Sequence, residues 1–187
     1  MGKHSEAMSA VDANGAGVIT NLGMGENCHA TGVYTFTCVD KEGNVKWVDD
    51  LDNLVTTVGK NFALDTVLAG SSYTATWYMG LITNTSYSAV AAGDTMASHA
   101  GWLESSNYSQ AARPTAAWSA ASAGSKALSA ALTFSINASD TIVGAFLVTV
   151  ATKSGTTGTL YSAGAFTGGN KTVASGDTLS VSYTASM

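Results

Sequence analysis

The sequence predicts a mainly-β protein: an antiparallel β-sandwich with Greek-key or jelly-roll-like connections, one α-helix near residues 53–69 and an extended N-terminal arm. Three observations support this. About eight strand-like segments are separated by turns rich in Gly, Ser and Thr. A single segment has apolar residues three and four apart, and residues 1–32 show neither period. Composition does not shift within 33–187, so we expect one sandwich domain there, preceded by an arm over 1–32.

The first 50 residues predict an arm followed by a β-hairpin. Residues 1–32 are rich in glycine and lack periodicity, which indicates an irregular segment. Two interpretations stay open: a frayed terminus, or an arm that orders against a neighbouring subunit. In 33–50, Tyr34, Phe36 and Cys38 alternate with β-branched residues, and the polar turn at 40–44 contains Gly43, which can adopt positive φ.

An amphipathic helix is predicted from about residue 53 to residue 69. Its apolar positions recur mostly at intervals of three and four: Leu51, Leu54, Val55, Val58, Phe62, Val67 and Leu68. Asp50 or Asp52 is predicted to cap the N-terminus, where a negative charge suits the helix dipole. Gly70 is predicted to end the helix. Gly59 lies inside it and costs roughly 0.5–1 kcal/mol relative to Ala.

The remainder of the chain is expected to be β-structure. Strands are predicted at residues 73–82, 127–136, 141–150, 159–166 and 178–185. The apolar run at 141–150 indicates a central strand. Pro114 is expected to open a further strand that ends near Ser119. Residues 88–98 predict a short helical turn, anchored by Trp102 and Tyr108.

Composition argues against several classes of protein. Charged residues make up 11% of the 187 residues, and the formal net charge is −5, whereas ordinary domains carry about 25% charged residues. With one arginine in the chain, no basic face can form, so we expect no direct contact with nucleic acid. No apolar run approaches the ~18 residues of a membrane span, and the first residues lack the apolar core of a secretory signal. We therefore expect no membrane partner.

Metal ligands are sparse in the sequence. Cys28 and His29 with Cys38 would make an incomplete zinc site, because a fourth ligand and a C-x-x-C pair are missing. The acidic residues between 49 and 52 lack the spacing of an EF-hand and are explained by helix capping. The sequence therefore predicts no metal and no other cofactor.

Catalytic groups are also few. His99 lies near Ser98, Asp94 and Glu104 in the sequence, but no G-x-S-x-G elbow accompanies it. A loop histidine that bonds to backbone is the favoured interpretation. Asp94 and Glu104 are ten residues apart and could form a carboxylate pair acting on sugars, but no aromatic platform marks a cleft. We expect a protein that is not an enzyme, with no catalytic residue.

Four segments taken together resemble a known family. They are GNVKWVDDLDNLVTTVG (43–59), AGSSYTATWYMGLI (69–82), AGDTMASHAGW (92–102) and GTTGTLY (155–161). They are similar to small structural proteins of tailed bacteriophages and prophages, and the resemblance covers about residues 33–185. It implies a virion component, above all a capsid decoration or cement protein on the outer surface of the shell. Its implied partners are the major capsid protein and other copies of itself, with a trimer suggested by analogy with capsid threefold positions.

Two alternatives remain from the sequence. One is a neck, collar or tail component of the same virion, which differs from a shell protein chiefly in copy number. The other, of a different class, is a glycan-binding module in which Trp102, Trp118 or Tyr108 offers a ring for stacking on a sugar.

Overall fold

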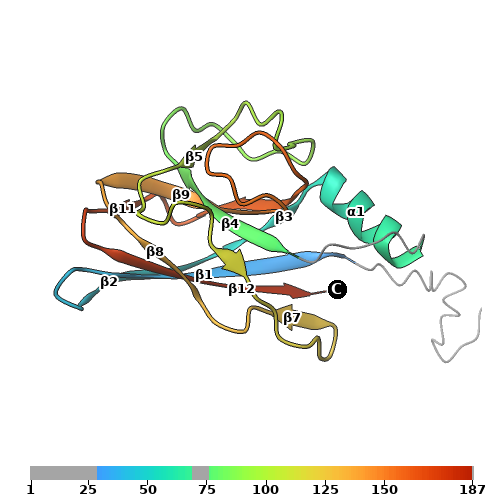
Figure 1. Cartoon of the computed structure of the whole chain (residues 1–187), viewed down its shortest axis with the longest axis horizontal. Coiled ribbons are helices and arrows are strands. Elements are labelled where there is room, and N and C mark those ends of the chain that lie inside the picture. Colours follow the sequence, from blue (N-terminus) through green and yellow to red (C-terminus); the bar gives the residue numbers. More distant parts are fainter. Residues whose placement is uncertain (1–28, 69–75, 187) are drawn as a thin grey trace, which may run out of the picture.

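The computed structural model describes residues 29–68 and 76–186, and they form two antiparallel sheets packed face to face (Figure 1). The described elements are β1 (Thr31–Val39), β2 (Val45–Asp52), β3 (Leu54–Val55), α1 (Thr57–Leu68), β4 (Trp77–Thr83), β5 (Leu103–Ser105), β6 (Thr115–Ala116), β7 (Ser125–Ala127), β8 (Leu132–Ser135), β9 (Asp140–Val148), β10 (Leu160–Ala165), β11 (Lys171–Val173) and β12 (Thr178–Ser186). The predicted mainly-β sandwich with one helix is confirmed.

The two sheets differ in the number and order of their strands. The first sheet has the order β2-β1-β12-β7, with β8 also paired to β12. The second has the order β3-β10-β9-β4-β5, with β11 paired to β9 and β6 to β4. All of these pairings are antiparallel. The main core lies between the sheets. A second apolar cluster lies where residues of the 84–102 loop, among them Met96 and Trp102, pack onto β4 and β9.

The hairpin predicted over 33–50 is confirmed. Tyr34, Phe36 and Cys38 are fully buried, and Gly43 in the connecting turn has a φ of +91°. Strand β1 begins at Thr31, two residues before the predicted start of the hairpin at residue 33. Residues 1–28, on which most of the arm prediction falls, lie outside the described residues.

The helix was predicted to begin four residues too early. Leu54 and Val55 form β3, which pairs with Ala163 and Ser162 of β10, so the apolar residues at 51–55 belong to strands. Asp50 and Asp52 belong to β2 and cap nothing. The cap is instead Thr56, whose Oγ1 accepts a hydrogen bond from the Gly59 amide at 3.1 Å. The predicted terminator, Gly70, lies outside the described residues.

Gly59 has a packing role that its helix propensity conceals. It is the one buried residue of α1, and an added Cβ would collide with the Tyr161 carbonyl of β10. The absence of a side chain therefore lets the first turn of the helix lie directly on the second sheet, and this contact offsets the conformational cost of glycine.

Several other elements differ from their predicted bounds, because pairing with distant strands outweighs the local sequence pattern. Residues 88–98 form turns around a Thr95–Ser98 bridge, so the predicted helical turn is wrong. Trp102 and Tyr108 are buried at 0% and 1% exposure, which confirms them as anchors. The strand after Pro114 spans two residues, and segment 127–136 divides into β7 and β8. The predicted central strand is β9, paired with both β4 and β10.

Candidate functional site

His99 is held by structural contacts. Its ring stacks on Trp102 with centroids 4.0 Å apart, and its Nδ1 donates a hydrogen bond to the Trp102 carbonyl at 2.9 Å. The nearby carboxylate of Asp94 accepts a 2.9 Å hydrogen bond from the Trp102 indole and does not orient the histidine. The interpretation of His99 as a loop histidine bonded to backbone is confirmed.

Glu104 forms a buried ion pair with the chain's one arginine instead of pairing with Asp94. Arg113 Nε and Nη2 donate to the two carboxylate oxygens of Glu104 at 2.9 and 2.7 Å. The side chains are 0% and 4% exposed. Arg113 also donates to the carbonyls of Val150 and Gly155, and its guanidinium lies 5.1 Å from the centre of the Phe146 ring. This pair joins β5, the segment before β6 and the loop after β9, and it occupies the carboxylate that sequence reasoning considered for catalysis.

The residues considered as metal ligands form no site in the part of the chain that is described. Burial, with the nearby charge of Asp177, raises the pKa of Cys38 to about 11, so the thiol stays protonated and donates to Asp177 at 3.8 Å. His29 is exposed, and Cys28 lies outside the described residues. Asp49 pairs with Lys171. Residues 29–68 and 76–186 contain no group of three His, Cys, Asp or Glu side chains placed to hold a metal ion.

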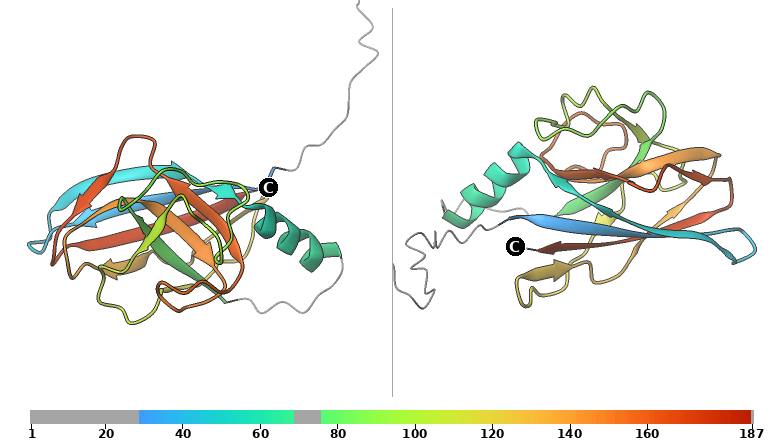
Figure 2. Two further views of the ribbon diagram at one scale, coloured as in Figure 1. Left: turned by 90° about the horizontal axis from the view of Figure 1, so that it is seen from above. Right: turned by 180° about the vertical axis from the view of Figure 1, so that it is seen from behind.

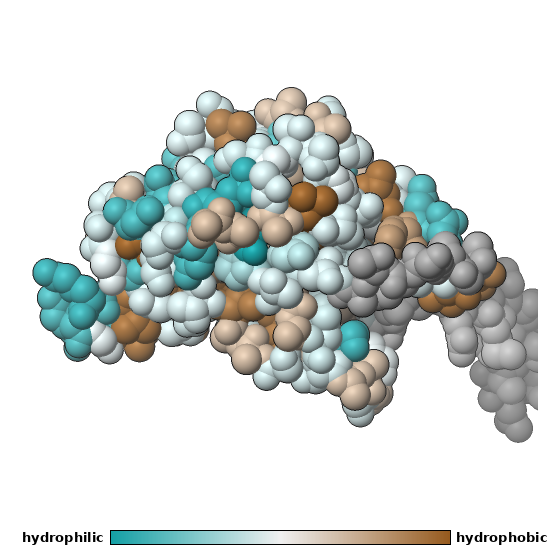
Figure 3. Space-filling model, in the orientation of Figure 1, coloured by the Kyte–Doolittle hydropathy of each residue, from teal (hydrophilic) through white to brown (hydrophobic). Residues whose placement is uncertain are grey.

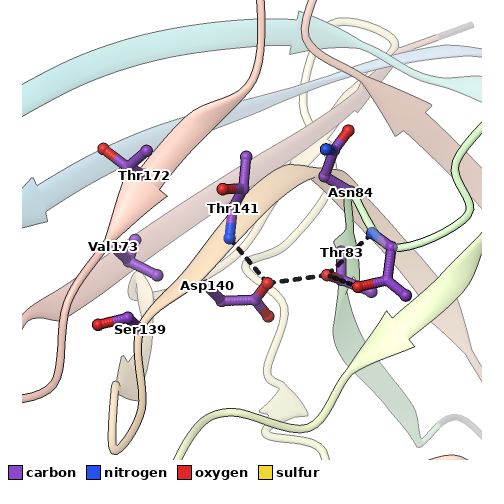
Figure 4. Close-up of a pocket in the computed structure, with 8 residues that line it drawn as sticks. Thr83, Asn84, Ser139, Asp140, Thr141, Thr172 and Val173 are labelled. Carbon is purple, nitrogen blue, oxygen red and sulfur yellow. Dashed lines mark hydrogen bonds between the residues drawn. The ribbon is translucent and has the colours of Figure 1, made fainter.

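A polar depression of about 570 Å³ lies around Asp140 (Figure 4). Its lining is neutral apart from Asp140: Thr83, Asn84, Thr85, Ser139, Thr141, Thr172 and Val173. The Asp140 carboxylate accepts hydrogen bonds from Thr83 Oγ1 at 2.8 Å, the Thr141 amide at 2.7 Å, Asn107 Nδ2 at 3.2 Å and the Ser105 hydroxyl. These four donors satisfy the carboxylate, so its role is to tie together the ends of β4, β5 and β9.

Two of the three rings considered for glycan stacking are inaccessible. Trp102 and Tyr108 are buried, as given above. Trp118 is half-buried and makes a T-shaped contact with Tyr183, with the ring centroids 5.9 Å apart. A stacking platform needs an exposed ring face. Trp102 and Tyr108 therefore cannot form one.

The outer face of the first sheet is the most regular surface feature. On β1 and β12, buried residues face the core and short hydroxyl side chains alternate with them on the other side. In the strand register, the hydroxyl pattern continues onto β8 as Thr133 and Ser135. On β2 the residues opposite the outer face of β1 are Val48, Asp50 and Asp52. We call this surface the hydroxyl face; it comprises Thr31, Val33, Thr35, Thr37, Val48, Asp50, Asp52, Thr133, Ser135, Thr178, Ser180, Ser182 and Thr184.

The hydroxyl face consists of rows that cross the strands. Thr35 lies opposite both Ser182 and Asp50, and Thr37 lies opposite Ser180, which in turn lies opposite Thr133. Its charged members, Asp50 and Asp52, are both on the edge strand β2. Period-two alternation of Thr and Ser within 31–37 and 180–184 was a visible signal for this face. The pairing that joins those segments was not, because about 145 residues separate them.

Besides Val33 and Val48 on the hydroxyl face, exposed apolar side chains lie on other parts of the surface. Leu64, Val67 and Leu68 protrude from α1, and Val45 is exposed on β2. Figure 3 shows brown side chains at the helix end and pale, weakly polar residues over much of the visible surface. Within the described residues, no helix has both the length and the apolar character required to span a bilayer.

Comparison with known proteins assigns the chain to no family. No protein-family model matches the chain, and no curated protein matches it significantly.

Proposed function

We propose that this chain is a structural protein of a tailed-phage virion, a capsid decoration or cement protein that bridges major capsid protein subunits on the outer shell. The observation that carries the proposal is the hydroxyl face, a sheet surface of short side chains with charges confined to one edge. The resemblance of the four sequence segments to phage structural proteins supports the same function.

Such a face suits adhesion for two physical reasons. Ser, Thr and Val side chains have few rotatable bonds, so docking them costs less conformational entropy than docking Lys, Arg or Glu. A face with few charges also has little to desolvate when it is buried against a partner. Each contact contributes modestly, but on a symmetric shell the same contact recurs in every copy.

An acidic, arginine-poor chain also fits the outside of the shell. The net charge of −5 offers no attraction for packaged DNA, which proteins bind chiefly through lysine and arginine. The buried Arg113–Glu104 pair leaves the single arginine unavailable to phosphates in any case. The proposed location is therefore the outer capsid surface, with assembly following synthesis in the host cytoplasm.

The proposal is tested on purified particles. Quantitative mass spectrometry should find on the order of hundreds of copies per particle, whereas about 6, 12 or 18 would indicate the alternative neck or tail location. Particles stripped of the protein should release DNA at a lower temperature, and adding the protein back should restore the original value. Absence from particles, or an unchanged release temperature, would contradict the proposal.

A variant series connects the function to the face. Thr35→Lys and Ser182→Lys place long cations at the centre of the hydroxyl face and should weaken attachment to stripped particles at least 10-fold. Thr157→Lys, at an exposed position in the loop between β9 and β10, is the matched control and should attach like the wild type. Equal attachment of all three variants would show that the hydroxyl face is not the contact.

A further inference from the structure

Helix α1 is anchored to the sandwich by its first half. Thr56 caps it, Gly59 lies against the Tyr161 carbonyl, and the Phe62 ring meets Trp77 edge-on at 5.5 Å between centroids. Beyond Phe62 the helix projects away from both sheets, as the two views in Figure 2 show.

The projecting half presents an apolar stripe to solvent. Leu64, Val67 and Leu68 are 56%, 77% and 80% exposed. Their spacing of three and four places them on one face of the helix, the arrangement typical of a buried helix face. We call these three residues the α1 stripe. A face of this kind is ordinarily covered, because exposed aliphatic surface is unfavourable in water.

The size of the α1 stripe restricts what can cover it. A stable interface between separate proteins takes about 20–30 residues from each side, and the stripe provides three. A small contact of this kind becomes effective when its partner is tethered, since a flexible tether raises the local concentration to about millimolar. The stripe therefore favours an occupant from the same chain over a second molecule.

The N-terminal segment enters the fold at this end. The Asn53 amide donates a 2.9 Å hydrogen bond to the Gly32 carbonyl, which places the start of β1 beside the residues that lead into α1. Figure 1 shows α1 and the start of β1 at the same end of the molecule. Residues 1–28 precede this point, and the nine residue steps from position 22 to position 31 alone can span about 30 Å at ~3.3 Å per residue. Helix α1, with 12 residues, is about 18 Å long, so reach is not limiting.

We propose that the segment Val18–Leu22 packs on the α1 stripe of the same chain. Val18, Ile19 and Leu22 are the densest group of aliphatic residues in positions 1–28. Residues 69–75, which directly follow the helix, have the sequence AGSSYTA and carry no Leu, Ile, Val or Met. The aliphatic segment on the N-terminal side is therefore the better chemical match. This inference is independent of the proposed virion function.

Photo-crosslinking in the full-length protein tests the proposal directly. A benzophenone amino acid incorporated at position 67 should give crosslinks at monomer mass that map to the peptide containing Val18–Leu22. The same group at position 45, an exposed valine on β2, is the control and should not label that peptide. Crosslinks at dimer mass, crosslinks to 69–75, or equal labelling from both positions would each overturn the proposal.

Hydrogen exchange supplies a second measurement on the same full chain. Replacing Leu64 and Leu68 together by Gln preserves helix propensity and should speed amide exchange in residues 18–22 at least 10-fold. Leu103→Gln, a similarly exposed leucine on β5, should leave that exchange unchanged. Exchange in 18–22 that does not respond to the helix variant would contradict the contact.

Discussion

Replacing Arg113 with Met should be among the most damaging single changes in this protein. The variant leaves Glu104 buried without its bidentate partner and removes the donors to the Val150 and Gly155 carbonyls. Breaking a buried ion pair from one side typically costs about 3–5 kcal/mol. The Ser154 amide, which also donates to Glu104, moderates the loss without replacing the cation.

Equilibrium unfolding in urea measures this effect. With a denaturant slope of about 2 kcal/mol per M, a loss of ~4 kcal/mol lowers the unfolding midpoint by about 2 M. The matched control is Lys41→Met, which removes a cation paired with Glu42 at 3.4 Å where both side chains are exposed. An exposed pair contributes ~0–1 kcal/mol, so the control midpoint should barely move.

A double variant isolates the cause. Glu104→Leu combined with Arg113→Met removes both charges and should be more stable than Arg113→Met alone, because no uncompensated charge stays buried. The reasoning is refuted if Arg113→Met is no less stable than Lys41→Met. It is equally refuted if the double variant gains nothing over the single one.

Two further predictions concern acid stability and strand packing. Burial alone would raise the pKa of Asp177, but hydrogen bonds from Lys46 and a backbone amide outweigh it and lower that pKa. The ionised carboxylate should therefore stabilise the fold fully above pH ~4, and this stabilisation should be lost as the pH falls further. Asp177→Asn should accordingly flatten the acid limb of a plot of unfolding free energy against pH. Gly144→Ala would drive a Cβ into the Gly164 carbonyl of the paired strand and should cost at least about 2 kcal/mol, whereas Gly93→Ala, which meets open space, should change the free energy of unfolding by less than ~0.5 kcal/mol.

Local alternation in the sequence predicted much of the sandwich. The alternation of Tyr34, Phe36 and Cys38 in the sequence matches the buried side of β1. The strand predicted at 178–185 corresponds to β12, whose Leu179, Val181 and Tyr183 are buried in the same alternating way. The start of the helix could not be located in this way, because the apolar residues at 51–55 satisfy a helical spacing and a strand equally well. Leu54 and Val55 form a strand because they pair with β10, more than 100 residues away, and Leu51 lies in β2, where it pairs with Tyr34 of β1.

The polar clusters were beyond sequence reasoning for the same reason. Asp140 is tied to Ser105 and Asn107, and Arg113 to Val150 and Gly155, through contacts that depend on the folded path of the loops. Sequence proximity was misleading for Asp94 and Glu104, which bond to Trp102 and Arg113 instead of to each other. The hydroxyl face was predictable only in part. The alternation within β1 and within β12 is visible in the sequence, but the pairing that joins the two strands into one surface is not.

The most direct test of adhesion through the hydroxyl face is a cryo-EM reconstruction of the particle at a resolution that orients the sandwich. The account predicts density on the outer shell, with the outer face of β1 and β12 against capsid subunits and the 84–102 loop directed away from them. Density confined to the tail axis, or a sandwich attached with that face open to solvent, would contradict it.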